Sequence, residues 1–517
     1  MDDEQYKWLI RGNVIVPTGQ QPTFSNDSTT TTSTSSSTSQ ESSEVPTDDD
    51  GVVKGGEEWI GVGYLKLLRD HIVAVSEEGI IKDIQPASDF IASASSTVVE
   101  TITTLDDDAF LCPGFVDLHI HAPQYAYTGT ATDRNLFEWL DHYTFPAERS
   151  LHDNLDLAKK VYDGVVNTTL SFGTTTAVYH TTLHLQPCKV LVDTALTAGQ
   201  RALIGKVCMD RNSPENYRQS IEQNVDETVE LIDYIHKTCG QRKNRKSDKQ
   251  EDDKKATPKL PLILPMVIPR FIPTCSPTLL TKLSEVVKEY DCYFTTHISE
   301  GLEEVEYSKK CDKEDHGLER TGSEVLESHG LLTDQCILAH CTHASDSDAA
   351  LLRKYGSAIA HCPLSNFFFG GGTFPCRKFV EQGNLVGLAT DVAGGYSPSM
   401  LHTQRDSVLA SRALNHTVSS SAIDYRQAFW LATLGGARSL GLQHKIGTLE
   451  VGFEFDAIVL SPKDSPIQIF DTDSLPDIFQ KLCVLGDDRN VKRVFVQGRE
   501  IGRNSRKRTR SPSSPAS

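Results

Sequence analysis

Three residues that can bind a metal or move protons, Asp117, His119 and His121, stand two positions apart in one apolar segment. Side chains of a β-strand alternate between its two faces, so these three would share one face. Two imidazoles placed in this way can reach one cation, with nitrogen–zinc bonds of ~2.0–2.1 Å. A pair of histidines satisfied inside a polar core would show the same spacing. The segment therefore predicts a metal site only if further ligands meet it.

Three later apolar segments each end in a residue of this kind. Residues 293–296 are followed by His297, residues 336–339 by His340, and residues 385–390 by Asp391. Parallel strands that end at one rim would bring these side chains to a shared centre, where barrel enzymes place their catalytic groups. One centre would then hold three neutral nitrogens and one carboxylate, supplied by His119, His121, His297 and Asp391.

This donor set suits one Zn²⁺ ion, and Fe²⁺ is an alternative. A zinc ion lowers the pKa of bound water from 15.7 to about 7, which favours hydrolysis or hydrolytic deamination. Glu300 follows His297 by three residues, where its carboxylate can take the proton of such a water and deliver it to a substrate ring nitrogen. The other interpretation of Glu300 is a residue at a helix N-terminus, stabilised by the helix dipole.

Candidate substrate contacts follow two of the strands. Arg270 and Phe271 come after the apolar stretch 262–268, and Gln124 lies three residues beyond His121. Arg270 offers planar donors for a carbonyl or ring edge, and its charge opposes a second cation, so we expect a single-metal site. Phe271 offers a flat face to a heterocycle, and Gln124 offers both a donor and an acceptor. Pairing of Arg270 with a surface carboxylate, and a surface position for Gln124, are the alternatives.

The elements that must position these residues form a repeated pattern. Eight short apolar runs rich in Val, Ile and Leu alternate with segments of helical spacing, such as 155–165 and 279–290. Eight such units predict a (β/α)8 TIM-type barrel over residues 109–444; a doubly wound open sheet would be expected to carry a GxGxxG turn, which is lacking. The runs are 115–121, 174–179, 201–207, 262–268, 293–297, 336–339, 358–361 and 385–390.

The two ends of the chain carry short strand-like pieces instead. Residues 1–108 and 445–502 are expected to form one small β-sandwich domain beside the barrel. The Ser/Thr-rich segment 20–57 predicts a disordered insertion, residues 240–257 a charged loop, and residues 503–517 a disordered basic tail.

Composition limits the partners. The formal net charge of -19 argues against nucleic acid as a ligand of the folded body. The acidic start of the chain is unlike a signal peptide, and no apolar run approaches the ~18 residues of a membrane span. A cytoplasmic protein without a membrane partner is expected.

Several motifs together resemble the amidohydrolase superfamily and, within it, the guanine deaminase family. They are PGFVDLHIHAPQY, PRF, HISE, AHCTH, AHCPLSN, TDVAGGYSPSML and IGTLEVGFEFDAIVL, in order from about Leu111 to Leu460. The resemblance implies a metal-dependent barrel with a flanking β-sandwich, in a cytosolic homodimer that converts guanine to xanthine and ammonia.

Carried to this chain, the resemblance also implies roles for single residues. It makes His119, His121, His297 and Asp391 the zinc ligands, and Glu300, Asp391 and His340 the catalytic groups. It places His121, Ala122, Pro123, Gln124, Arg270, Phe271, His297, Glu300 and Asp391 around the purine. Two alternative functions stay open. The chain could be another amidohydrolase-type deaminase or chlorohydrolase that acts on a related heterocycle, or a catalytically silent barrel that serves as a scaffold.

Overall fold

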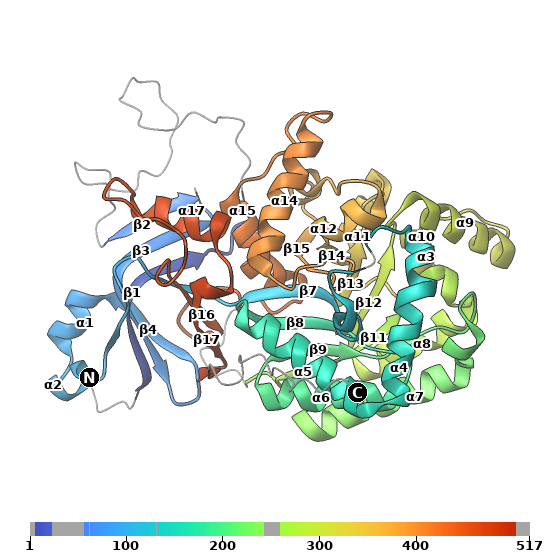
Figure 1. Cartoon of the computed structure of the whole chain (residues 1–517), viewed down its shortest axis with the longest axis horizontal. Coiled ribbons are helices and arrows are strands. Elements are labelled where there is room, and N and C mark those ends of the chain that lie inside the picture. Colours follow the sequence, from blue (N-terminus) through green and yellow to red (C-terminus); the bar gives the residue numbers. More distant parts are fainter. Residues whose placement is uncertain (1–5, 23–55, 62, 131, 242–258, 503–517) are drawn as a thin grey trace, which may run out of the picture.

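The computed structural model describes residues 6–22, 56–61, 63–130, 132–241 and 259–502. Nearly all of the predicted insertions 20–57 and 240–257, and the whole tail 503–517, lie outside these described residues. In the described part, an α/β barrel stands beside a second sheet, at the right and left of Figure 1 respectively.

Eight parallel strands form the barrel, as predicted. Neighbouring strands pair in parallel in the order β15-β14-β13-β12-β11-β9-β8-β7. The first and last strands of this order are joined by the segment that follows the last strand in the chain. There, Asp391 N–H donates to the carbonyl of His119, and His121 N–H donates to the carbonyl of Val392, at 2.9 Å each. The strands are β7 (Phe115–His121), β8 (Thr174–His180), β9 (Arg201–Gly205), β11 (Ile263–Pro269), β12 (Tyr293–Ile298), β13 (Cys336–His340), β14 (Ala358–His361) and β15 (Leu385–Leu388).

Helices cover the outside of the barrel and follow the predicted spacing. In α8 (Pro277–Tyr290), Ser276 caps the N-terminus by accepting from Leu279 N–H, and Asp291 ends the helix in the left-handed conformation. Leu279, Leu283 and Val287 of this helix are buried in the main core, which holds the helix against the barrel. The other main crossover helices are α5 (Leu155–Ser171), α6 (Leu185–Ala198), α7 (Ile221–Cys239), α9 (Leu302–His316), α11 (Asp346–Tyr355) and α14 (Met400–Asn415).

The second sheet combines both ends of the chain, as expected for the additional domain. Its main path runs β18-β17-β16-β6-β1-β3-β2, with β4 beside β3 and β5 beside β1. Its strands are β1 (Tyr6–Pro17), β2 (Glu57–Gly61), β3 (Leu65–Ser76), β4 (Ile81–Pro86), β5 (Thr103–Thr104), β6 (Phe110–Pro113), β16 (Ala457–Leu460), β17 (Val491–Val496) and β18 (Arg499–Glu500). The division of the chain at residues 109 and 445 stays a prediction.

A buried ion-pair network joins the two sheets. Arg201, the first residue of β9, donates to Glu454 at 2.7 Å and to Asp456 at 3.0 Å, and all three side chains are buried. This network lies at the end of the barrel opposite to the one where the strands deliver the predicted site residues.

Candidate active site

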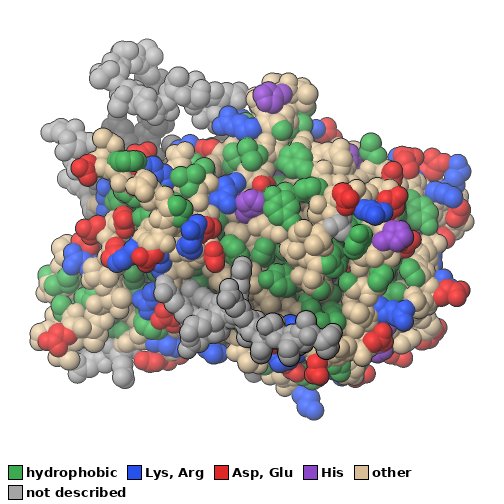
Figure 2. Space-filling model, in the orientation of Figure 1, with side chains coloured by type: hydrophobic (Ala, Val, Ile, Leu, Met, Phe, Trp, Pro, Cys, Tyr) green, Lys and Arg blue, Asp and Glu red, His purple; other side chains and the backbone are tan. Residues whose placement is uncertain are grey.

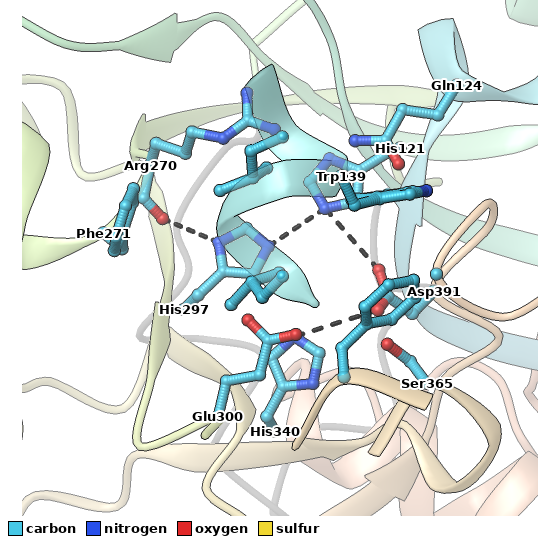
Figure 3. Close-up of a pocket in the computed structure, with 14 residues that line it drawn as sticks. His121, Gln124, Trp139, Arg270, Phe271, His297, Glu300, His340, Ser365 and Asp391 are labelled. Carbon is cyan, nitrogen blue, oxygen red and sulfur yellow. Dashed lines mark hydrogen bonds and ion pairs between the residues drawn. The ribbon is translucent and has the colours of Figure 1, made fainter. Parts of the chain in front are cut away.

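Three imidazoles meet at the C-terminal rim of the barrel. His119 and His121 come from β7 and His297 from β12, and all three are buried. The Nε2 atoms of His121 and His297 lie 2.9 Å apart, and His297 Nδ1 lies 2.6 Å from the carbonyl oxygen of Arg270. That carbonyl accepts a hydrogen bond from Nδ1–H, so the proton of the neutral ring is on Nδ1 and Nε2 keeps its lone pair. Figure 3 shows the rings of His121 and His297 directed toward one another.

Asp391 faces the same point from beyond β15. Its Oδ1 lies 3.1 Å from His119 Nε2 and 3.5 Å from His121 Nε2. Ligand atoms around one tetrahedral zinc ion stand about 3.3 Å apart, given bonds of ~2.0–2.1 Å. The separations of 2.9–3.5 Å among these groups therefore fit a single cation. Two groups of possible metal ligands overlap here. The first contains His119, His121, His180 and His297, and the second contains His119, His340 and Asp391.

Two further predicted groups, Glu300 and His340, stand next to Asp391. His340 Nε2 lies 3.7 Å from Glu300 Oε1 and 3.8 Å from Asp391 Oδ2, while its Nδ1 contacts Asn366 Oδ1 at 3.0 Å. His340 and Asp391 both have left-handed backbone, with φ of 69° and 48°. Such conformations cost energy in non-glycine residues and cluster at functional sites.

Burial and charge set the protonation of these groups. Burial lowers the pKa of His119, His121 and His297 below the ordinary imidazole value, which favours the neutral form that a metal requires. Burial acts to raise the pKa of Asp391, but His119, His340 and His297 outweigh it and hold that pKa at about 2.

The pKa values of Glu300 and His340 are both raised, for different physical reasons. Burial raises the pKa of Glu300 above the ordinary glutamate value, which prepares its carboxylate to take up a proton. Burial acts to lower the pKa of His340, yet the carboxylates of Glu300 and Asp391 raise it above the ordinary value.

A pocket opens above these groups and brings the predicted substrate contacts together. Gln124, Arg270 and Phe271 line it; Ala122 and Pro123 are buried in the turn after β7 and are not among its lining residues. Contact of those two residues with a substrate stays a prediction. The lining residues are His121, Gln124, Leu136, Trp139, Leu140, Arg270, Phe271, His297, Glu300, His340, Ser365, Phe369, Asp391 and Gly394.

Glu148 of α4 (Phe145–Asp153) is a buried carboxylate that the sequence did not indicate. It accepts hydrogen bonds from two polar residues that line the pocket. Arg270 donates to it through Nη1 at 2.8 Å and Nη2 at 3.2 Å, and Gln124 Nε2 donates at 3.0 Å. The hydroxyl of Tyr217 donates at 2.6 Å, and Ala393 N–H donates to the other end of the Gln124 amide at 3.3 Å. Arg270 is therefore paired with a carboxylate inside the protein, whereas the sequence suggested a surface pair as the alternative.

The apolar walls of the pocket were also missed. The ring centroids of Trp139 and Phe369 lie 4.8 Å apart, and both side chains line the pocket. Gly394 also lines the pocket, and a Cβ atom added there would come within 2.9 Å of Asp391 Oδ2. A side chain at this position would therefore displace the carboxylate.

Comparisons with known proteins agree with this geometry. Residues 110–501 match the amidohydrolase family, and the chain belongs to it. The guanine deaminase of Dictyostelium discoideum is 36% identical over 459 residues, covering 86% of this chain and 96% of that one. Within the amidohydrolases, the chain groups with the guanine deaminases.

Solved structures give the same assignment. Escherichia coli guanine deaminase superimposes with a TM-score of 0.75 at 28% identity, covering 95% of this chain and 99% of that chain. Guanine deaminase from C. acetobutylicum, with guanine bound in its active site, gives 0.73 at 26% identity, covering 96% and 100%. The predicted barrel enzyme is confirmed, and the scaffold alternative is not supported.

Proposed function

We propose that this protein deaminates guanine by hydrolysis, releasing xanthine and ammonia. Similarity to guanine deaminases supports the substrate, and one of these relatives holds guanine in its active site. The observation that carries the chemistry is the meeting of three buried imidazoles with the ionised carboxylate of Asp391 beside Glu300.

The four predicted ligands fit one metal ion. Two unprotonated Nε2 atoms 2.9 Å apart, those of His121 and His297, repel each other unless a proton or a cation lies between them. Nε2 of His119 is buried and makes no hydrogen bond among the described residues, although Asp391 Oδ1 lies 3.1 Å away, so its lone pair is available to a cation. His119, His121, His297 and Asp391 would hold Zn²⁺, with Fe²⁺ as the alternative; a bound ion lowers the pKa of water to about 7 and readies it for attack.

Glu300 and Asp391 would then handle the protons. Glu300 takes one proton from the attacking water and delivers it to the ring nitrogen beside C2, while the new C2–O bond forms. Asp391 accepts the second proton and passes it to the amino group as the C2–N bond breaks. His340 Nε2 lies 3.7 Å from Glu300 and 3.8 Å from Asp391, so a protonated His340 can stabilise the negative charge of these carboxylates during the proton transfers. Guanine and water thus yield xanthine and ammonia.

Specificity would come from the edge and the faces of the ring. Arg270 keeps three of its five N–H donors after pairing with Glu148 and can meet a carbonyl oxygen. Adenine has no carbonyl at the matching position, so a donor would stay unpaired at a cost of ~1–3 kcal/mol. Phe271, Trp139 and Phe369 offer flat apolar surfaces to the ring.

An absorbance assay for guanine-to-xanthine conversion, combined with metal quantification, tests the proposal. Purified protein should form xanthine, lose activity on chelation and regain it with Zn²⁺. Adenine and cytosine serve as controls, and ammonia release from either at a rate comparable with guanine would contradict the substrate assignment.

Location and assembly stay predictions. No helix among the described residues is both long and apolar enough to cross a membrane. On the face shown in Figure 2, Lys and Arg side chains lie among acidic ones. That the folded body does not bind nucleic acid stays a prediction. Residence in the cytoplasm and assembly as a homodimer rest on the family resemblance.

A further inference from the structure

A fourth histidine, His180, lies beside the predicted ligands. It ends β8, and β7 pairs with β8 in parallel so that His121 and His180 are register partners. Its side chain has 0% exposure. Neither of its ring nitrogens has a hydrogen-bond partner within the described ranges.

The ring of His180 faces the other histidines. Its centroid lies 4.3 Å from that of His119, 4.9 Å from that of His121 and 5.2 Å from that of His297. One ligand atom from each of the four lies within 4.8 Å of all the others. Two donors on opposite sides of a cation stand about 4.1 Å apart at bonds of ~2.05 Å, so small side-chain shifts bring all four onto one ion.

An unpaired buried imidazole is costly. A buried polar group without a partner loses about 1–3 kcal/mol of hydration that nothing replaces. A cation held among the four rings would reduce this cost for His180, because the ring nitrogen that carries no proton can donate its lone pair to a metal.

We propose that His180 is a further ligand of the active-site metal. The proposal rests on the metal site of the proposed function and extends it to five protein groups: four imidazoles and Asp391. A set so rich in imidazole suits Zn²⁺, Fe²⁺, Ni²⁺ and Cu²⁺, and the fifth group favours ions that accept more than four ligands.

Cobalt binding by metal-free full-length protein tests the proposal. Co²⁺ is the probe because its visible absorption weakens as the number of ligands rises. In His180→Asn, cobalt affinity should fall at least about tenfold, a drop typical even of residues that only support a metal ligand. The cobalt band of this variant should be stronger than that of the wild type.

His361 provides a matched control. It ends β14, is buried, and has two ring nitrogens without hydrogen-bond partners among the described residues, yet it belongs to neither donor group. His361→Asn should keep the cobalt affinity and spectrum of the wild type. An equal loss in both variants would assign the effect to general damage and overturn the proposal.

X-ray absorption of the wild-type protein loaded with metal gives an independent measurement, which does not depend on whether a variant folds. Four imidazole ligands support the proposal, and three overturn it. Wild-type affinity in His180→Asn overturns the role of His180 alone. Failure of the wild type to bind any divalent ion instead overturns the metal site of the proposed function, so the two failures are distinguishable.

Discussion

Arg270 and Glu148 form a buried ion pair between the end of β11 and helix α4. Nη1 and Nη2 of Arg270 lie 2.8 Å and 3.2 Å from the two carboxylate oxygens, and both side chains are almost fully buried. Two parallel hydrogen bonds fix the plane of the guanidinium as well as its position. The same carboxylate also holds Gln124, so one residue orients both polar contacts predicted for the substrate.

Glu148→Gln should therefore impair both stability and catalysis. The substitution leaves the Arg270 charge buried without its counter-charge, which lowers the free energy of unfolding by about 3 kcal/mol. Loss of orientation at Arg270 and Gln124 should lower kcat/KM for guanine at least about tenfold, while metal content is retained. Urea unfolding and steady-state kinetics measure the two effects.

Asp456→Asn is the control for Glu148→Gln. It removes one of the two carboxylates that pair with the buried Arg201 at the opposite end of the barrel and leaves Glu454 in place. A loss of stability, smaller than that of Glu148→Gln, with unchanged kcat/KM is expected. Glu148→Gln with wild-type kcat/KM would show that Glu148 does not position the substrate contacts.

Glu300→Gln should retain the metal and lose turnover. The amide cannot take a proton from water, so kcat should fall at least about 100-fold, within the range typical of general acid–base groups. Glu303→Gln, three residues along the chain and exposed, should leave kcat unchanged. Metal quantification accompanies the kinetics, and an active Glu300→Gln enzyme would remove this residue from the mechanism.

Gly394→Ala probes the position of the Asp391 carboxylate. The added methyl group would meet Asp391 Oδ2 at 2.9 Å and Ser365 Oγ at 2.7 Å, closer than carbon and oxygen atoms normally approach. Overpacking of this kind should cost about 1–3 kcal/mol of stability and weaken metal binding. Gly19→Ala, with no atom within 4 Å of the added carbon, is the control. Unchanged metal affinity in Gly394→Ala would show that the carboxylate is not a ligand.

Local pattern was sufficient to predict the barrel strands and the groups at their ends. Apolar runs bounded by turns identified all eight strands, because each strand is buried on both faces. His180 is the last residue of β8, as His340 is of β13, whereas the predicted strand ends one residue earlier, at Tyr179. The sequence therefore contained the signal for this residue, a histidine directly after an apolar run.

Glu148 could not have been found in this way. It lies on a short helix among Arg149, His152 and Asp153, where a glutamate is normally exposed. Its partners Gln124 and Arg270 are 24 and 122 residues away along the chain. Only the packing of α4 over the barrel rim turns this surface-type residue into the centre of a buried network.

Glu304→Gln should change the pH dependence of stability. Burial raises the pKa of Glu304 from 4.5 to about 7, while Ser308 donates to its carboxylate at 2.6 Å. Between these values the folded protein binds more protons than the unfolded chain, so the contribution of Glu304 is full below pH 4.5 and is lost as pH rises to about 7. The loss amounts to about 3 kcal/mol, at about 1.36 kcal/mol per pKa unit.

Urea unfolding of the wild type and Glu304→Gln at about pH 5 and about pH 8 measures this loss. Relative to the variant, the wild type should lose stability between the two values, because the neutral amide does not titrate. Glu306→Gln, on the exposed face of the same helix, should show no such difference. The expectation would be contradicted if the difference in unfolding free energy between the wild type and Glu304→Gln were the same at both pH values. The backbone N–H of Glu300, 3.2 Å from Glu304 Oε2, would then donate to an ionised carboxylate at both pH values.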